Sequence, residues 1–328
     1  MALPVLADSV RIADDGVHIL DRRVFPQRRE WVCCATLEDV ARAIEDMVTQ
    51  SSGPYFAALW AMVLAAREAE SDPRPRTRLE EAGARLVSTR PTNNHLRKAV
   101  DRVLARVDER DLVASATEGA RCGEAVYRRS SRVLGEHTAA LLPDQGCALT
   151  HCWPDLYLVE LVRALQEQDK RVRFACTETR PYAQGARLTA VTLAEMGVDT
   201  TLITDSMGAA LLASGDVDAL VTAADRVTAD GHVINKVGTL GLAVAAHAFD
   251  VPFHAMVQAP DTSTPSAEDV PIEYRDGAEV LAAAGVSEPG IHGWYPAFDV
   301  TPPRFVTTVV TDRGPFGPHE LDRYEEEL

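Results

Sequence analysis

The sequence predicts an α/β protein, in which a Rossmann-like domain with a parallel sheet follows a smaller, mostly helical domain with a short β start. Three observations favour this fold class. Short apolar pieces alternate with turns over residues 1–35, helical patterns fill the chain to about residue 142, and apolar β-type runs then alternate with helical patterns. Repeated β-α-β order is typical of a parallel sheet with helices on both faces.

The first predicted domain spans residues 1–142. The runs at 9–12 and 17–20 flank the turn signal Asp14-Asp15-Gly16, which predicts a small β-meander. The apolar spacing after Thr36, a plausible N-cap, predicts a first helix over 37–47. Further helices are expected at 55–70, 78–86, 94–107 and, with interruptions, 111–142, while the two prolines of 71–75 indicate a loop.

The second predicted domain spans residues 143–328 and begins at the Pro143-Asp144-Gln145-Gly146 segment. Its apolar runs predict strands, and the segments between them predict helices. The strands are expected at 147–150, 172–177, 200–204, 219–224, 253–257 and 305–311, and helices are expected to start near Asp155, Gln184, Ser206 and Gly238.

Composition narrows the classes of function. The 328 residues are 46% hydrophobic and 25% charged, which is typical of a soluble globular protein. A net charge of -16 argues against nucleic acid or an anionic membrane as the main partner. Without a signal pattern or a bilayer-length apolar run, we expect a cytoplasmic protein. The six cysteines lack zinc-site spacing, so free thiols and no metal are expected.

The most informative segment follows the apolar run at 218–224. Asp225 would stand where that strand ends, and ligands collect at the carboxyl ends of strands in open α/β sheets. Asn235 and Lys236 come just before Gly238-Thr239, which would open a helix. A carboxyl, an amide, an ammonium and a helix N-terminus indicate a site for a small anionic substrate. A polar loop with an ordinary turn aspartate is an equal alternative.

A cysteine stands at a second predicted strand end. Cys152 follows the strand at 147–150 and precedes a helix whose first turn would hold Pro154. This position would lower the pKa of the thiol from about 8.5 and favour the thiolate. A packed structural thiol is the commoner alternative. His151 could assist the thiol or could be a hydrogen-bonded structural residue.

Other polar residues stand at helix starts. Gln184 is neutral and could bind sugar hydroxyls. Arg180 or Arg187 could hold a phosphate or pair with Glu178. Arg90, just before the helix expected at 94–107, is a candidate phosphate contact.

Short motifs run almost end to end along the chain. They are Ile19-Leu20-Asp21-Arg22-Arg23 with Pro26, Ala43-Ile44-Glu45-Asp46-Met47, Ser88-Thr89-Arg90-Pro91-Thr92, Thr150-His151-Cys152, Glu178-Thr179-Arg180-Pro181 with Gln184-Gly185-Ala186-Arg187-Leu188-Thr189-Ala190, Ile203-Thr204-Asp205-Ser206-Met207, Ala224-Asp225-Arg226 through Asn235-Lys236-Val237-Gly238-Thr239, Val270-Pro271-Ile272-Glu273, and Pro296-Ala297-Phe298-Asp299-Val300-Thr301-Pro302. In this order they resemble the S-methyl-5-thioribose-1-phosphate isomerase family, whose relatives include archaeal ribose-1,5-bisphosphate isomerase and the regulatory subunits of translation initiation factor 2B.

The resemblance implies an aldose-ketose isomerase whose substrate carries phosphate on the anomeric oxygen. The family's catalytic pair falls on Cys152 and Asp225. Its substrate contacts fall on Arg90, Gln184, Asn235, Lys236, Ser51 and Ser52. The resemblance also implies no metal or redox cofactor, a small phosphorylated sugar as the partner, a homodimer, and a place in methionine salvage.

A mechanism follows as a hypothesis. Asp225, protonated in a dry pocket, would donate a proton to the ring oxygen and open the sugar. Cys152 would then move a proton from carbon 2 toward carbon 1. Lys236, Arg90 and helix N-termini would hold the phosphate. Initiation-factor relatives typically lack the pair, so a non-catalytic subunit that senses phosphosugars or nucleotides is the alternative from another class.

Three departures from the family pattern bear on the substrate. The family's Arg-Gly-Ala loop falls on Gln50-Ser51-Ser52, its Asn-Ala-Gly stretch on Trp153-Pro154-Asp155, and its Asn before Pro-Ala-Phe-Asp on Tyr295. A missing cation and an added carboxyl disfavour a second phosphate. We therefore expect one phosphate, on carbon 1, and a neutral carbon-5 end, with ribose 1,5-bisphosphate as the alternative substrate.

Overall fold

The computed structural model describes residues 3–90 and 94–326. The chain divides into two compact units, which are Val5–Arg129, and Ser130–Leu328 together with Met1–Pro4. The division falls inside helix α5 (Leu112–Leu141), which continues from one unit into the other. The domain boundary expected at 142–143 stays a prediction.

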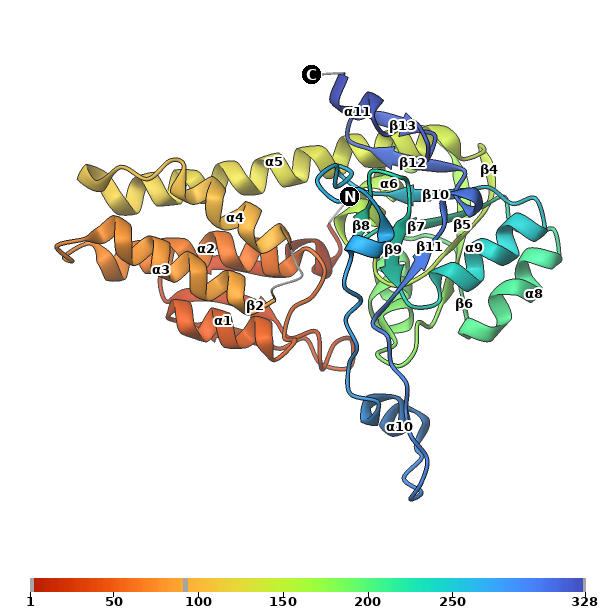
Figure 1. Cartoon of the computed structure of the whole chain (residues 1–328), viewed down its shortest axis with the longest axis horizontal. Helices are drawn as coiled ribbons and strands as arrows, with labels where there is room; N and C mark the ends of the chain where they lie inside the picture. The colour runs from red at the N-terminus through yellow and green to blue at the C-terminus, as the bar shows by residue number, and fades with distance from the viewer. Residues whose placement is uncertain (1–2, 91–93, 327–328) are drawn as a thin grey trace. The chain divides into compact units, whose positions relative to one another are not determined.

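The unit Val5–Arg129 contains a small antiparallel sheet and a group of helices (Figure 1). The sheet has the strand order β1-β2-β3, so the meander expected at the N-terminus gains a third strand. The elements are η1 (Val5–Asp8), β1 (Val10–Ala13), β2 (Gly16–Leu20), β3 (Trp31–Cys34), α1 (Leu37–Glu45), α2 (Gly53–Ala69), α3 (Pro75–Ser88), α4 (Asn94–Leu104), η2 (Glu109–Asp111) and the first part of α5.

Local sequence explains where these helices begin. The Thr36 hydroxyl accepts a hydrogen bond from the Asp39 backbone nitrogen at 3.2 Å, and the Asp39 carboxylate accepts one from the Thr36 nitrogen at 3.0 Å. This capping box fixes the start of α1 where it was predicted. Helix α3 begins at Pro75, which was expected in the preceding loop, because the first helical position tolerates a residue without an N–H.

Helix α5 is continuous over 30 residues, so the interruptions expected there are wrong. Its glycines at 119, 123 and 135 sit where other segments approach its backbone closely, and an added Cβ would collide with them. These glycines therefore serve close packing and do not break the helix. Tertiary contacts outweigh their low intrinsic helix propensity.

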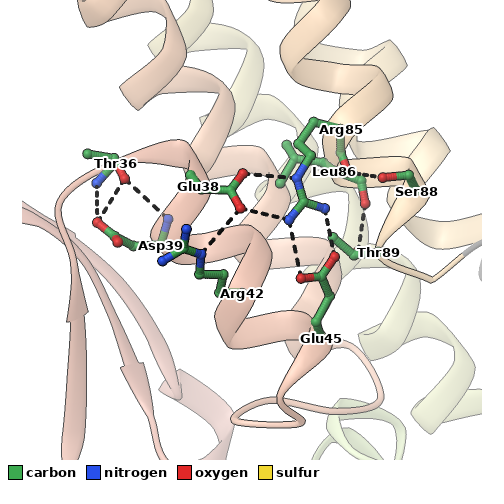
Figure 2. A network of polar contacts seen from close by, with 9 residues as sticks. All are labelled: Thr36, Glu38, Asp39, Arg42, Glu45, Arg85, Leu86, Ser88 and Thr89. Carbon is green, nitrogen blue, oxygen red and sulfur yellow. Dashed lines mark hydrogen bonds and ion pairs between the residues drawn. The ribbon is translucent and has the colours of Figure 1, made fainter.

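An arginine joins α3 to α1 in this unit (Figure 2). The Arg85 guanidinium donates to Glu38 at 2.9 Å and to Glu45 at 2.7 Å, and both carboxylates belong to α1. The Thr89 hydroxyl donates to the Leu86 carbonyl oxygen at 2.6 Å at the end of α3. The segment that leads to Arg90 is thereby held against α1.

The unit Ser130–Leu328 is built on a seven-stranded sheet with the strand order β13-β12-β10-β7-β4-β5-β6, parallel except for β13. The predicted fold class, a Rossmann-like parallel sheet, is confirmed. The elements are β4 (Gln145–Thr150), α6 (Leu156–Glu167), β5 (Arg171–Thr177), η3 (Gly185–Thr189, a π-helical turn), α7 (Ala190–Glu195), β6 (Thr200–Ile203), η4 (Asp205–Met207), α8 (Gly208–Ala213), β7 (Ala219–Ala223), β8 (Arg226–Val227), β9 (Val233–Lys236), α9 (Thr239–Ala248), β10 (Phe253–Met256), η5 (Ala267–Asp269), α10 (Ala278–Ala284), β11 (Phe298–Thr301), η6 (Pro303–Phe305), β12 (Thr308–Thr311), β13 (Gly314–Phe316) and α11 (Arg323–Glu326).

Two boundaries differ from the prediction because of prolines. Helix α6 begins at Leu156, so Pro154 lies before the helix and not in its first turn. The strand expected at 305–311 begins only at Thr308, because Pro303–Phe305 form a 3-10 turn.

The strand order reverses between β4 and β7. From β4 the chain steps to β5 and β6, and it then returns to the other side of β4 for β7, β10 and β12. Right-handed crossovers therefore place α6 and α7 on one face and α8 and α9 on the other. Ala148 pairs with Ala219 and Leu149 with Leu220, which brings the carboxyl ends of β4 and β7 side by side. Ligands of open α/β sheets bind at such a reversal.

A second sheet has three strands in the order β11-β9-β8, and β8 follows β7 directly in the chain. This sheet contains Asn235 and Lys236, which pair with Asp299 and Phe298. These two residues therefore lie in a strand and not in the polar loop that was one of the two alternatives. The partner strand β11 is more than sixty residues away in the chain, and a four-residue strand gives little periodicity to read.

The apolar core of this unit lies around the parallel strands. Leu149, Leu220, Phe253, Leu242 and Val309 belong to one buried cluster. Within residues 3–90 and 94–326, none of the helices combines the length and the apolar character needed to cross a bilayer.

Candidate active site

The two residues predicted to be catalytic lie on either side of the strand reversal. Cys152 stands two residues past the end of β4, and Asp225 stands two residues past the end of β7. Because β4 and β7 are parallel neighbours, both residues are at the same edge of the sheet. The carboxylate of Asp225 is close enough to affect the pKa of the Cys152 thiol.

The loop that holds Cys152 is strained and fixed by neighbours. Cys152 has a φ of 67°, an uncommon value for a residue with a side chain. Its backbone nitrogen donates to the Thr179 hydroxyl at 2.9 Å, and its carbonyl oxygen accepts from the Thr189 hydroxyl. Such strained positions cluster at functional sites and persist where the surroundings determine them.

The loop after β5 is held in the same way. Thr179 and Ala183 have φ values of 62° and 59°. The Asp205 carboxylate accepts hydrogen bonds from the backbone nitrogens of Thr179 and Arg180, both at 2.7 Å. Asp205 thus fixes the loop that contains Thr179, and Thr179 in turn positions Cys152. The local sequence did not predict this role, because Asp205 resembles an ordinary helix-capping aspartate.

Burial disfavours the thiolate form of Cys152. Burial raises its pKa to about 11, the Lys236 ammonium opposes the rise, and the Asp225 carboxylate adds to it. The prediction of a lowered pKa is wrong because the desolvation of the thiol exceeds the opposing effects of the Lys236 ammonium and the Trp153 backbone N–H, and α6 begins only at Leu156.

The raised pKa of the Cys152 thiol predicts that the rate of its alkylation depends on pH. At pH 7 roughly one thiol in 10,000 would be ionised at a pKa of about 11. We expect alkylation of Cys152 by iodoacetamide to speed up about tenfold per pH unit between pH 7 and 10, because only the thiolate reacts. Peptide mass spectrometry measures the rate, with Cys152→Ala to assign the peptide. A rate that levels off below pH 9 contradicts the raised pKa.

His151 has a structural role, which was one of the two alternatives left by the sequence. Its Nδ1 lies 2.6 Å from the Thr177 hydroxyl and its Nε2 lies 3.0 Å from the Val237 carbonyl oxygen. Since a carbonyl only accepts, Nε2 carries the proton. Burial lowers the pKa of the ring, which favours the neutral form. The imidazole thereby links β4, β5 and the start of α9.

Lys236 and Asn235 are both buried, and the Lys236 ammonium is close enough to affect the pKa of the Cys152 thiol. The Lys236 ammonium donates to the Ala297 carbonyl oxygen at 2.8 Å and lies 4.7 Å from the centre of the Phe298 ring. The ring of Tyr295 is 6.0 Å away. The Asn235 amide donates to the Thr239 hydroxyl at 3.0 Å. Burial raises the pKa of Tyr295 to about 12, so it is a neutral phenol next to the cation.

The N-terminus of α9 is occupied by a carboxylate. Asp299 accepts hydrogen bonds from the backbone nitrogens of Gly238 at 2.7 Å and Leu240 at 3.2 Å. Burial raises the pKa of Asp299 to about 6, and the two N–H groups oppose the rise. The expectation that this helix N-terminus holds a phosphate is therefore wrong. The Pro-Ala-Phe-Asp motif includes Asp299, but the motif did not predict that this carboxylate binds the N-terminus of α9.

Gln184 has the properties of a ligand contact. It precedes the π-helical turn η3, is 7% exposed, and its Oε1 has no hydrogen-bond partner within the described parts of the chain. The two nearby arginines contact protein groups: Arg180 donates to the Ala283 carbonyl oxygen, and the Arg187 guanidinium lies 5.5 Å from the Tyr182 ring centre.

Gly185 lets the η3 turn approach strand β5. A Cβ at this position would collide with the Thr177 carbonyl oxygen. We expect Gly185→Ala to lower the free energy of unfolding by at least about 2 kcal/mol, because backbone atoms must move. The matched control is Gly241→Ala in α9, where a Cβ meets open space and helix propensity improves. Equal urea midpoints for the two variants would contradict the close approach.

The unit Val5–Arg129 holds the other predicted contacts. The Arg90 Nη1 lies 3.0 Å from the Met47 sulfur. Ser51 is exposed with a φ of 56°, and Ser52 is buried just before α2. Pro91 and Thr92 of the same motif lie outside the described residues.

A buried arginine lies against the loop that departs from the family pattern, and sequence reasoning missed it. Arg22 is 1% exposed, and it donates to the Gln50 carbonyl oxygen at 2.6 Å and to the Ser9 hydroxyl at 2.8 Å. Gln50 is also buried, and its amide nitrogen lacks a partner in the described structure. The Arg22 guanidinium therefore contacts the Gln50-Ser51-Ser52 loop, which has no positively charged residue of its own.

Comparison with known proteins defines the class of this chain. The model of the initiation factor 2 subunit family matches residues 29–318. The chain therefore belongs to this family, as the sequence motifs predicted.

Named relatives lie in the isomerase branch. The methylthioribose-1-phosphate isomerase of Pelotomaculum thermopropionicum is 37% identical over 333 residues, which cover 94% of this chain and 91% of the relative. The enzyme of the same name from Chloroflexus aurantiacus is 38% identical over 328 residues, 92% of each chain.

Solved structures of both branches share the fold. The 5-methylthioribose 1-phosphate isomerase of Pyrococcus horikoshii has a TM-score of 0.88 at 28% identity and covers 99% of this chain and 98% of its own. The delta subunit of translation initiation factor eIF-2B from A. fulgidus has a TM-score of 0.81 at 31% identity, covering 97% and 96%. Because an isomerase and an initiation-factor subunit share this fold, the fold alone does not distinguish the two functions, and the residues of the site have to do so.

Proposed function

We propose that this protein is an aldose-ketose isomerase that converts a carbon-5-modified ribose 1-phosphate, such as S-methyl-5-thioribose 1-phosphate, into the ribulose 1-phosphate. The observation that carries the proposal is the placement of Cys152 and Asp225 on either side of the strand reversal, with the Lys236 ammonium acting on the same thiol. A thiol and a carboxyl at the same edge of the sheet supply the acid and base that the reaction needs.

In the proposed reaction, Cys152 and Asp225 share one proton between them. Asp225 donates its proton to the ring oxygen as the bond between that oxygen and carbon 1 breaks, and the Cys152 thiolate takes the proton of carbon 2. The resulting enol phosphate regains that proton at carbon 1, while the carbon-2 hydroxyl returns a proton to Asp225. The products are a ketone at carbon 2 and an unchanged pair.

This cycle needs the proton on Asp225 and a thiolate at Cys152 at its start, whereas burial raises the pKa of the Cys152 thiol. Asp225 is exposed, so the structure does not place it in the dry pocket that was expected. Binding of the substrate has to remove water from Asp225 and to shift the proton from sulfur to oxygen. Lys236 favours this shift because its positive charge stabilises the thiolate.

The substrate contacts follow from the unpaired polar atoms and the family pattern. Lys236 binds the phosphate, and Asn235 and the free Gln184 Oε1 bind polar groups of the sugar. Arg90, Ser51 and Ser52 are further contacts by family resemblance. Trp153 is 4% exposed and its indole nitrogen has no partner among residues 3–90 and 94–326, so it is a candidate contact for the carbon-5 end.

We propose that the substituent on carbon 5 of the substrate carries no charge. Asp155 is a buried carboxyl in the loop that carries Cys152, and Gln50 is neutral where the family has a cation. Both differences disfavour a second phosphate, and a lost charge-assisted contact costs about 1.5–3 kcal/mol.

A substrate panel tests this function. Steady-state kinetics with S-methyl-5-thioribose 1-phosphate, 5-deoxyribose 1-phosphate, ribose 1-phosphate and ribose 1,5-bisphosphate should give the highest kcat/KM for a 5-thio or 5-deoxy sugar. The highest kcat/KM for the bisphosphate would refute the neutral carbon-5 end. Binding of these sugars without turnover would instead identify a sensing subunit.

We also propose a cytoplasmic homodimer that acts in methionine salvage. This rests on the family resemblance and on the activity named for the relatives. Light scattering at micromolar concentration should report a dimer, and a monomer would contradict this part of the proposal.

A further inference from the structure

Three side chains of types that bind metal ions meet on the small sheet of the unit Val5–Arg129, whereas Cys152 and Asp225 belong to the other unit. Asp15 lies in the turn between β1 and β2, and His18 and Cys33 are direct partners on β2 and β3. Side chains of paired residues point to the same face of a sheet. One ligand atom from each of the three residues can be chosen so that all lie within 4.8 Å of one another.

The distances within this cluster are near those of a metal site. Asp15 Oδ1 lies 2.8 Å from His18 Nε2, and Cys33 Sγ lies 3.8 Å from Asp15 Oδ2. Ligands around a tetrahedral zinc ion, with bonds of 2.0–2.3 Å, are about 3.5 Å apart. Shifts of about an ångström in exposed side chains would therefore place all three donors around one ion.

The charges around the cluster favour a cation. The carboxylates of Asp15 and Asp39 both act on the Cys33 thiol, so a dication bound there would meet two negative charges. The Arg11 guanidinium, on the neighbouring strand, is paired with Asp8 at 2.9 Å and lies over the Trp31 ring. Asp39 is engaged in the cap of α1, so it is not a fourth ligand.

We propose that Asp15, His18 and Cys33 bind one divalent ion of the zinc class, with water in the fourth position. An imidazole, a thiolate and a carboxylate select zinc, cobalt or a similar ion over magnesium or calcium, which prefer oxygen ligands. The site is independent of the isomerase function. Sequence spacing gave no sign of it, because its donors come together only when β2 pairs with β3.

Cobalt titration of the full-length chain tests the site. The protein is used without a polyhistidine tag and after dialysis against a chelator. We expect one Co²⁺ per chain, a thiolate-to-cobalt absorption band in the near ultraviolet, and displacement of cobalt by Zn²⁺. Cys33→Ser should remove the band, and His18→Gln and Asp15→Asn should each weaken binding at least about tenfold.

Two matched controls separate the site from general charge and thiol effects. Asp14→Asn removes the same charge from the adjacent residue of the turn, and Cys122→Ser removes a thiol from α5, and both should bind cobalt like the unaltered chain. The replaced side chains are exposed or partly exposed, so circular dichroism should show folded variants. The proposal is overturned if the unaltered chain shows no band, if Cys33→Ser keeps it, or if Asp14→Asn weakens binding as much as Asp15→Asn.

Discussion

Cys152→Ala and Asp225→Asn each lower kcat on the best sugar 1-phosphate by at least about 100-fold. A positioned acid or base typically contributes a factor of this size. The two residues share one proton in the proposed cycle, so removing either one stops both proton transfers. The double variant should therefore be little worse than either single variant, because residues that act as a unit are not additive.

Matched controls show whether these losses are specific. Cys122→Ala removes another partly exposed thiol, and Asp250→Asn removes another exposed carboxyl at a residue with positive φ, a backbone conformation that asparagine tolerates. Both should keep kcat within about twofold. Thermal unfolding should stay near that of the unaltered chain for all four variants, and near-normal turnover by Cys152→Ala or Asp225→Asn would exclude the pair as the catalytic groups.

Lys236→Met lowers kcat/KM by about 10- to 100-fold. The ammonium is the proposed phosphate contact, and a charge-assisted hydrogen bond contributes about 1.5–3 kcal/mol. Its positive charge also holds down the pKa of the Cys152 thiol, so its loss should slow alkylation of Cys152 at a given pH. This second readout would not change if Lys236 only packed against Phe298.

Lys170→Met is the control for this lysine. The Lys170 ammonium donates to the carbonyl oxygens of Ala139 and Leu142 at 2.8 and 2.7 Å, so it too is bound to main-chain oxygens. It stands just before β5, at the opposite end of that strand from the site. Its loss should affect stability but neither kcat/KM nor the labelling of Cys152. Similar kcat/KM values for the two variants would contradict the assigned role of Lys236.

The sequence predicted the strands of the parallel sheet because each is a short apolar run next to a helical pattern. The strand ends at Thr150 and Ala223 then placed Cys152 and Asp225 at one edge of the sheet. The family assignment, which rests on motifs spread over the chain, is confirmed by the match over residues 29–318.

Features that depend on distant contacts could not be predicted in this way. The raised pKa of Cys152 comes from burial by several segments, and the position of Asp299 on the α9 N-terminus needs the pairing of β9 with β11. The contact of Arg22 with Gln50 joins residues 28 positions apart. Local patterns report propensity and periodicity, whereas these features arise only from tertiary structure.

The most direct test of the account is a phosphorus and carbon NMR time course with S-methyl-5-thioribose 1-phosphate and 5-deoxyribose 1-phosphate. The unaltered protein is predicted to convert at least one of them into a ketose 1-phosphate with a carbonyl at carbon 2, while Cys152→Ala under the same conditions leaves the sugar unchanged. No ketose from either sugar with the folded, unaltered protein, or equal conversion by Cys152→Ala, would contradict the account.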